Sequence, residues 1–194
     1  MANAWDLGLD YERIYKRLVK ELKEIRGRRG KRALARRTYL VVLLTQLRNG
    51  SRVGEAINAV IEFYKQKKNI VEVRVEKKKR EEYRKMVLPK EITREDLEIA
   101  GPRLLALVDK YNSREDLSDK EKNNRITATI SNWAKKYLKI NTHSLRYAFI
   151  TYLIKKGYPA SLIAKMTHHS KLDMILNYTQ QKTADKILED LDSL

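Results

Sequence analysis

The segment N-T-H-S-L-R combines a histidine and an arginine in a way that suits an anion. His143 and Arg146 are three residues apart at the predicted start of a helix, so their side chains share one face. A helix N-terminus adds exposed N–H groups and positive potential. The pattern favours a site for one phosphate group, although an isolated pair of this kind is more often surface decoration.

The segment T-H-H-S contains the other two histidines, His168 and His169, and Tyr178 follows His169 by nine residues. A tyrosine has a pKa of about 10, and nearby cations favour its nucleophilic phenolate. Tyr178 also ends an apolar helical pattern, so core packing is its alternative role. Nine residues of straight helix span roughly 13 Å. His169 and Tyr178 can therefore contact the same phosphate only if the chain folds back or if a neighbouring subunit supplies the tyrosine.

A third candidate, Arg52, lies where a buried helix over residues 38–48 breaks at N-G-S and the next helix begins. A long side chain at such a junction reaches across a cleft. Its planar, permanently charged fork suits the oxygens of a phosphate. We expect Glu55 to support an arginine through an ion pair.

The clearest β pattern covers residues 69–89. Valines at positions 71, 73 and 75 alternate with charged residues, which indicates a half-buried strand. Residues 83–88 can return antiparallel, and Pro89 ends the hairpin. The turn between the strands contains four basic residues: Lys77, Lys78, Lys79 and Arg80.

The remaining pattern is helical, with seven glycines and three prolines in 194 residues. Apolar residues recur at helical spacing, and predicted helices cover residues 9–26, 126–137, 142–156 and 160–166. Capping-box pairs mark further helix starts at Thr93/Asp96, Ser113/Asp116 and Ser118/Glu121. The predicted fold class is α+β and mainly α-helical, with a small antiparallel β-sheet.

The charge balance indicates the kind of partner. The chain has 42 Lys and Arg against 25 Asp and Glu, a net charge of +17. Such a charge favours a polyanion, and nucleic acid over a membrane. Residues 11–37 alone carry twelve basic residues and three glutamates, which makes this lead-in either a solvated surface or an arm that contacts phosphates.

Other classes are excluded by composition. The chain has no cysteine, so disulfides, zinc fingers and thiol catalysis are ruled out. Adjacent histidines chelate poorly, and no metal site is expected. The most apolar run, residues 39–47, is too short to span a bilayer. We expect a cytoplasmic protein, in the host cell if a virus encodes it, and the abundant Lys and Glu fit a thermophile.

Joined in chain order, these segments resemble the catalytic domain of the tyrosine recombinases, the phage-integrase family, and are similar to integrases of archaeal viruses and plasmids. The family pattern is R…K…H-x-x-R…H/W…Y. The step of twenty-three residues from Arg146 to His169 and the nine-residue step to Tyr178 fit it. The resemblance covers about residues 35–180. It assigns catalytic roles to Arg52, Lys79 (with Lys77 and Lys78 as alternatives), His143, Arg146, His169 and the nucleophile Tyr178.

The resemblance implies a tyrosine-recombinase catalytic fold and site-specific DNA recombination or integration through a 3′-phosphotyrosine, without a cofactor. The expected partner is double-stranded DNA, on which the protein forms a tetramer, whereas the free protein is a monomer or weak oligomer. A type IB topoisomerase and a non-catalytic DNA-binding module are the alternatives, the latter because residues 158–176 imitate a helix-turn-helix. The expected DNA contacts are Lys77, Lys78 and Arg80 in the turn and Arg28, Arg29, Lys31 and Arg32 in the lead-in.

One catalytic domain is expected over residues 1–194. It consists of a basic helical lead-in (1–35), a catalytic core (36–180) and a C-terminal helix (181–194) that can dock on a neighbouring protomer. We expect no counterpart of the family's N-terminal DNA-clamping domain. The chain departs from the family pattern at two positions: His168 replaces the usual glycine, and Tyr147 stands where a histidine is frequent.

Overall fold

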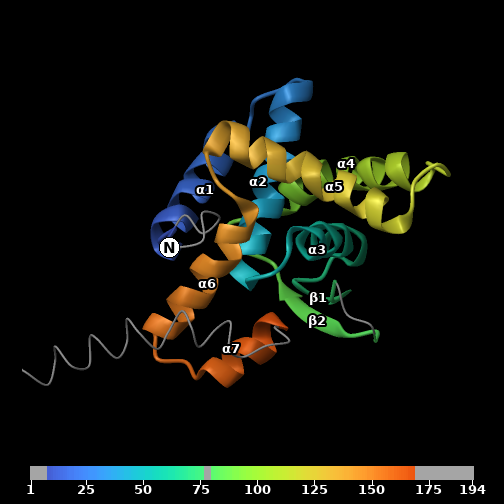
Figure 1. The fold of residues 1–194 in the computed structure, drawn as a ribbon. Helices are drawn as coiled ribbons and strands as arrows, with labels where there is room; N and C mark the ends of the chain where they lie inside the picture. The colour runs from blue at the N-terminus through green and yellow to red at the C-terminus, as the bar shows by residue number, and fades with distance from the viewer. Residues whose placement is uncertain (1–7, 77–79, 169–194) are drawn as a thin grey trace, which may run out of the picture.

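The computed structural model describes residues 8–76 and 80–168, which form a mostly helical molecule with a small β-hairpin (Figure 1). This is the predicted α+β class. In chain order the elements are α1 (Tyr11–Ile25), α2 (Lys31–Asn49), α3 (Val53–Gln66), β1 (Ile70–Arg74), β2 (Tyr83–Val87), α4 (Arg94–Asn112), α5 (Asp119–Trp133), the π-helical turn η1 (Ala134–Leu138), α6 (Thr142–Lys155) and α7 (Ala160–Thr167).

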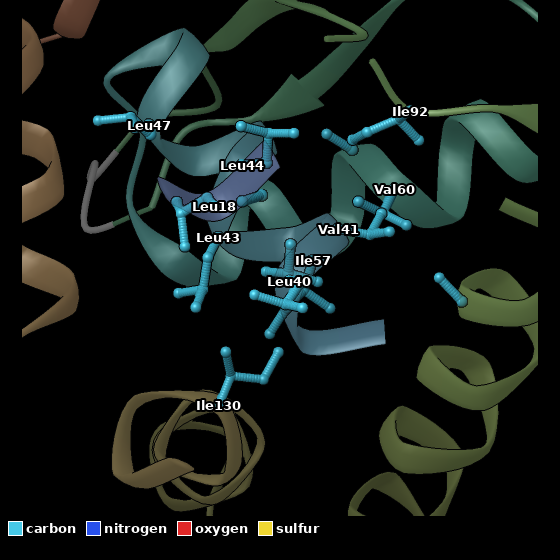
Figure 2. Packing of buried hydrophobic residues seen from close by; sticks show 14 of the residues in the cluster. Leu18, Leu40, Val41, Leu43, Leu44, Leu47, Ile57, Val60, Ile92 and Ile130 are labelled. Carbon is cyan, nitrogen blue, oxygen red and sulfur yellow. The ribbon is translucent and has the colours of Figure 1, made fainter. Parts of the chain in front are cut away.

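Helix α2 is the centre of the core. It packs against α1, α3, α4 and α6, and its residues from Leu40 to Leu44 are fully buried. A helix that is apolar on every side needs neighbours all round, which confirms the buried helix predicted over 38–48. Figure 2 shows this packing, with Leu40, Leu43 and Leu44 of α2 among Leu18 of α1, Ile57 and Val60 of α3 and Ile130 of α5.

The hairpin has the predicted antiparallel arrangement. Its register pairs Ile70 with Val87 and Arg74 with Tyr83. The inward positions of both strands are buried, and β1 packs on α3 while β2 packs on α2. Beyond the strands, the Val75 N–H donates to the Glu82 carbonyl over 2.7 Å. The pairing therefore continues beyond the strands as far as Val75 and Glu82, and residues 77–79 lie outside the described residues.

Two of the three predicted capping boxes are present. The Thr93 and Ser118 side chains accept from the backbone N–H three residues on, at the starts of α4 and α5. The third is wrong. Ser113 ends α4, and Asp116 instead pairs with Arg114, two residues before it, over 2.7 Å. Spacing alone does not separate a capping box from a polar turn, because both use the same residue types.

Helix α6 begins as predicted, at Thr142, where the Asn141 side chain accepts from the backbone N–H of His143 over 3.0 Å. It runs from the core toward α7 in Figure 1, and a second, smaller apolar cluster joins these two helices. In the described part of the chain no helix is long and apolar enough to cross a membrane. The same part contains no group of three or more His, Cys, Asp or Glu placed to hold a metal ion.

Candidate active site

The structure describes three of the six predicted catalytic residues: Arg52, His143 and Arg146. The lysine turn (Lys77, Lys78 and the preferred Lys79), His169 and Tyr178 lie outside the described residues.

The break between α2 and α3 positions Arg52. Gly50 ends α2 in the left-handed conformation, at φ +56°, and a Cβ added there would lie 2.1 Å from the Phe149 ring of α6. The position therefore requires glycine for its backbone angle and for its close approach to α6. Two residues later, Arg52 has an extended backbone and is the N-cap of α3.

Arg146 connects three helix ends. From α6 its guanidinium donates to the Gly50 carbonyl over 3.2 Å and to the Thr167 carbonyl over 2.7 Å. These carbonyls close the C-terminal ends of α2 and α7, where the helix dipole is negative. The side chain is buried, with 2% of the residue exposed. Arg146 is therefore fixed at the junction of α2, α6 and α7.

Burial and neighbouring positive charge both act on Arg146. Burial and, after it, the charge of Arg52 lower the pKa of Arg146 from 12.5 to about 10, with Glu55 opposing the shift and Arg84 adding a smaller contribution. The guanidinium stays protonated at neutral pH. The charges of Arg52, Arg84 and Arg146 therefore act on one another, and an anion bound near them would be stabilised.

Arg52 links α3 to the end of the hairpin. Its Nη1 donates to Glu55 Oε1 over 3.1 Å and to the Glu76 carbonyl over 3.0 Å. About a quarter of its side chain, 24%, is exposed. This contact fixes Glu76, the last described residue before Lys77, beside Arg52.

Glu55 is fully buried and holds this arrangement together. Its carboxylate accepts from the Arg52 N–H and Nη1 (both 3.1 Å), from the Glu76 N–H over 3.2 Å, and from Arg84 Nη1 over 3.1 Å. A buried carboxylate needs such donors, because leaving it unpaired would be costly. The predicted ion pair of Glu55 with an arginine is confirmed.

The sequence analysis missed Arg84. It lies on β2, next to Met86 on the buried face of the hairpin, and only 5% of it is exposed. Besides Glu55, its guanidinium donates to the Asn49 carbonyl over 2.6 Å. A signal was present: in a strand with period-two alternation, a charged residue at an inward position needs a buried partner.

His143 is exposed on the first turn of α6, one turn before Arg146. Its ring meets the Tyr147 ring edge-on, with centroids 5.0 Å apart. Tyr147, which replaces the histidine frequent in the family, is buried. It therefore acts as a support for the His143 ring.

His168 closes α7 in the left-handed conformation, at φ +54°. This is the backbone region that favours glycine. His168, which stands where the resemblance to the family implies a glycine, therefore adopts a backbone conformation typical of glycine. The imidazole Nδ1 lies 3.4 Å from Glu82 Oε2 in the hairpin, so the side chain connects α7 to the hairpin.

With this geometry described, the sequence can be compared with known proteins. The model of the phage integrase family matches residues 11–185, most of the chain. The chain belongs to the phage integrase family. It is 34% identical to an uncharacterized protein of Methanocaldococcus jannaschii, over all of this chain and 91% of that protein. It is 33% identical to a putative integrase of Acidianus two-tailed virus, over 96% of this chain and 68% of the relative.

Solved structures of tyrosine recombinases share the fold of this integrase-family chain. XerA recombinase matches with a TM-score of 0.51 at 20% identity, over 92% of this chain. XerH site-specific recombinase, bound to its difH substrate in a pre-cleavage complex, also matches with a TM-score of 0.51, at 18% identity and over 92% of this chain. The chain spans 63% of the first and 51% of the second.

The predicted DNA contacts of this integrase-family chain fall at two separate places. Arg80 is exposed and directly follows the lysine turn. The four lead-in residues are exposed around the start of α2, whose other end carries Gly50. Because α2 rises 1.5 Å per residue over 19 residues, the two ends are roughly 27 Å apart. The lead-in group, Arg28, Arg29, Lys31 and Arg32, therefore lies too far from Arg52 for both to contact the same phosphate.

Proposed function

We propose that this protein is a tyrosine recombinase that cuts and rejoins double-stranded DNA at a specific site through a 3′-phosphotyrosine intermediate. The observation that carries the proposal is a cluster of three arginines: Arg52 and Arg84 share the carboxylate of Glu55, and Arg146 interacts electrostatically with both of them. Three guanidiniums and one carboxylate leave a net positive charge. The anionic phosphodiester, and the charge that builds on its oxygens during attack, would be stabilised there.

In the proposed reaction the Tyr178 phenol loses its proton to solvent, and its oxygen attacks the scissile phosphorus. The bond between phosphorus and the 5′-oxygen breaks while the bond to Tyr178 forms. Lys79, or one of its neighbours in the turn, gives a proton to the leaving oxygen, which becomes a 5′-hydroxyl. Attack by a 5′-hydroxyl on the phosphotyrosine reverses these steps, so rejoining needs no external energy source.

The described residues supply the electrostatic part of this chemistry. Arg52 and Arg146 would bind the non-bridging oxygens with their planar forks. His143, on the same helix as Arg146, would complete the hydrogen bonds with His169. The lysine turn follows Glu76, whose backbone is bonded to both Arg52 and Glu55. This contact supports a general acid close to the phosphate that the arginines hold.

The proposed partner is a recombination site in duplex DNA, and four protomers would assemble on two such sites. The net charge of +17 and the DNA-bound state of the XerH structure support the DNA part. Sedimentation of the protein with and without site DNA would test the assembly, and we expect a tetramer only with DNA.

Covalent trapping tests the chemistry. The protein and a Tyr178→Phe variant are incubated with a nicked duplex whose cleaved piece diffuses away, and adducts are resolved by denaturing gel and mass spectrometry. We expect an adduct on Tyr178 that the variant lacks. Intact DNA binding without any adduct would contradict the proposal. Relaxation of supercoiled plasmid that needs no specific site would assign the adduct to a topoisomerase.

A further inference from the structure

We infer that Arg84 is a positioning residue for Arg52: by holding one side of the Glu55 carboxylate, it leaves most of the Arg52 guanidinium available to the DNA phosphate. The inference rests on the proposed function, which assigns that phosphate to Arg52. Neither the sequence pattern nor the family comparison gives Arg84 a role.

The first step of the argument is geometric. Arg84 Nη1 bonds Glu55 Oε2, whereas Arg52 Nη1 bonds Glu55 Oε1, each over 3.1 Å. Arg84 Nη2 is held by the Asn49 carbonyl over 2.6 Å. Asn49 in turn is fixed to β2, because its amide accepts from the Val87 N–H over 2.8 Å and donates to the Val87 carbonyl over 2.9 Å. Arg84 is therefore rigidly held.

The second step concerns the donors that Arg52 keeps. A carboxylate and a guanidinium pair most strongly through two parallel hydrogen bonds. Arg84 and the Arg52 backbone N–H occupy Glu55 Oε2, which prevents that arrangement. Among the described residues, Arg52 uses only Nη1, for Glu55 and the Glu76 carbonyl. Its Nε and Nη2 are left to face an anion, on a side chain that is 24% exposed.

The third step concerns charge. A single arginine beside Glu55 would form a neutral pair with little attraction for DNA. Arg84 supplies a second positive charge that is 95% buried and therefore weakly screened. One carboxylate shared by two guanidiniums stays positive overall. Without Arg84, Glu55 would neutralise Arg52 and draw it into a bidentate pair.

Single-turnover trapping at saturating protein tests the inference. Arg84→Met removes the charge but keeps a long, unbranched side chain. Arg84→Lys keeps the charge but replaces the planar guanidinium by a single ammonium group. Lys85→Met is the matched control, since it removes a positive charge from the neighbouring, exposed position of the same strand. Two substrates are compared: a phosphodiester, and a methylphosphonate in which a methyl group replaces one charged oxygen at the cleavage site.

We expect Arg84→Met to form the adduct about 10- to 100-fold more slowly on the phosphodiester, the range for a misplaced catalytic group. On the methylphosphonate it should stay within about threefold of wild type, because less charge needs stabilising there. Arg52→Met should show the same pattern. Arg84→Lys should recover part of the rate, and Lys85→Met should match wild type on both substrates.

The other outcomes are equally decisive. An equal loss on both substrates would make Arg84 a scaffold residue and overturn the inference, as would a wild-type rate for a folded Arg84→Met. If Arg84→Met does not fold, the same comparison with Arg84→Lys decides. The proposed function fails separately, if the wild-type protein forms no adduct on Tyr178 with either substrate.

Discussion

Single residues at helix ends carry much of the geometry of the site. Within the described chain, three residues other than glycine have a left-handed backbone: Lys67, Lys139 and His168, each directly after a helical segment. A side chain in this conformation costs roughly 1–2 kcal/mol. His168 has this conformation at a position where the resemblance implies a glycine, and its imidazole Nδ1 lies 3.4 Å from Glu82 Oε2.

Two substitutions at His168 separate backbone strain from the side-chain contact. His168→Ala and His168→Gly both lose the contact with Glu82, but only glycine removes the strain. We expect His168→Gly to be more stable than His168→Ala by about 1 kcal/mol, measured as the free energy of unfolding in urea. Lys139, at φ +58°, is the control position. Lys139→Gly should likewise be more stable than Lys139→Ala by about 1 kcal/mol. If His168→Ala were as stable as His168→Gly, the left-handed backbone at this position would not be strained.

At the scale of elements, the junction of α2 with α6 depends on Gly50. Gly50→Ala should destabilise the protein by about 2–5 kcal/mol, combining the left-handed backbone with overpacking against Phe149. Gly27 is a matched control, because it has φ +80° but open space around it; Gly27→Ala should cost only the backbone part, about 1–2 kcal/mol.

A double variant tests the steric part at the same junction. Adding Phe149→Leu should return part of the stability that Gly50→Ala loses, because it makes room for the new methyl group. Urea unfolding of the four proteins of this cycle measures the coupling. If the two substitutions change the free energy of unfolding additively, the Phe149 ring does not limit how closely α2 and α6 approach.

The basic loop between α1 and α2 is a second element that can be tested. If Arg28 and Arg29 each contact one phosphate, replacing both by Gln should reduce the slope of log binding constant against log salt concentration by up to about 1.8. Adduct formation at saturating protein should not change, because the loop is roughly 27 Å from Arg52. Lys110 and Lys120, both exposed on other helices, give the matched control pair. An unchanged slope would make the loop a solvated surface.

The sequence predicts elements and motifs better than long-range partners. The periodicity of apolar residues predicted the buried helix and the hairpin, and the spacing of the motifs identified Arg52, His143 and Arg146 as candidate site residues. The partners of these residues are distant in the chain, with Arg146 and Gly50 separated by 96 positions and Arg84 and Glu55 by 29. Local patterns can indicate that an inward charge such as Arg84 needs a partner, but they do not identify the partner, which is fixed only when the helices and the hairpin pack together.

At the scale of the whole molecule, a buried ion network connects α1, α2 and α4 away from the candidate site. Asp96 is fully buried. Its carboxylate accepts from Arg26 over 2.6 Å, from Arg37 over 2.7 Å and from the Thr93 N–H over 2.8 Å. Burial would raise the pKa of Asp96, but the hydrogen bonds from Arg26, Thr93 and Arg37 outweigh it and lower the pKa.

Because the pKa of Asp96 is lowered in the folded protein, the free energy of unfolding depends on pH. In acid the unfolded chain binds a proton at Asp96 more readily than the folded protein does, so this contribution is present above about pH 4 and lost as the pH falls below it. Asp96→Asn should cost about 3–5 kcal/mol at pH 7 because it removes the buried charge that Arg26 and the buried Arg37 share. The difference in the free energy of unfolding between Asp96→Asn and wild type, measured in urea, should shrink between pH 4 and pH 2.

Asp116→Asn is the control: it breaks an exposed pair with Arg114 and should change stability little at either pH. A difference that stays constant with pH would show that the charge of Asp96 does not hold the three helices together.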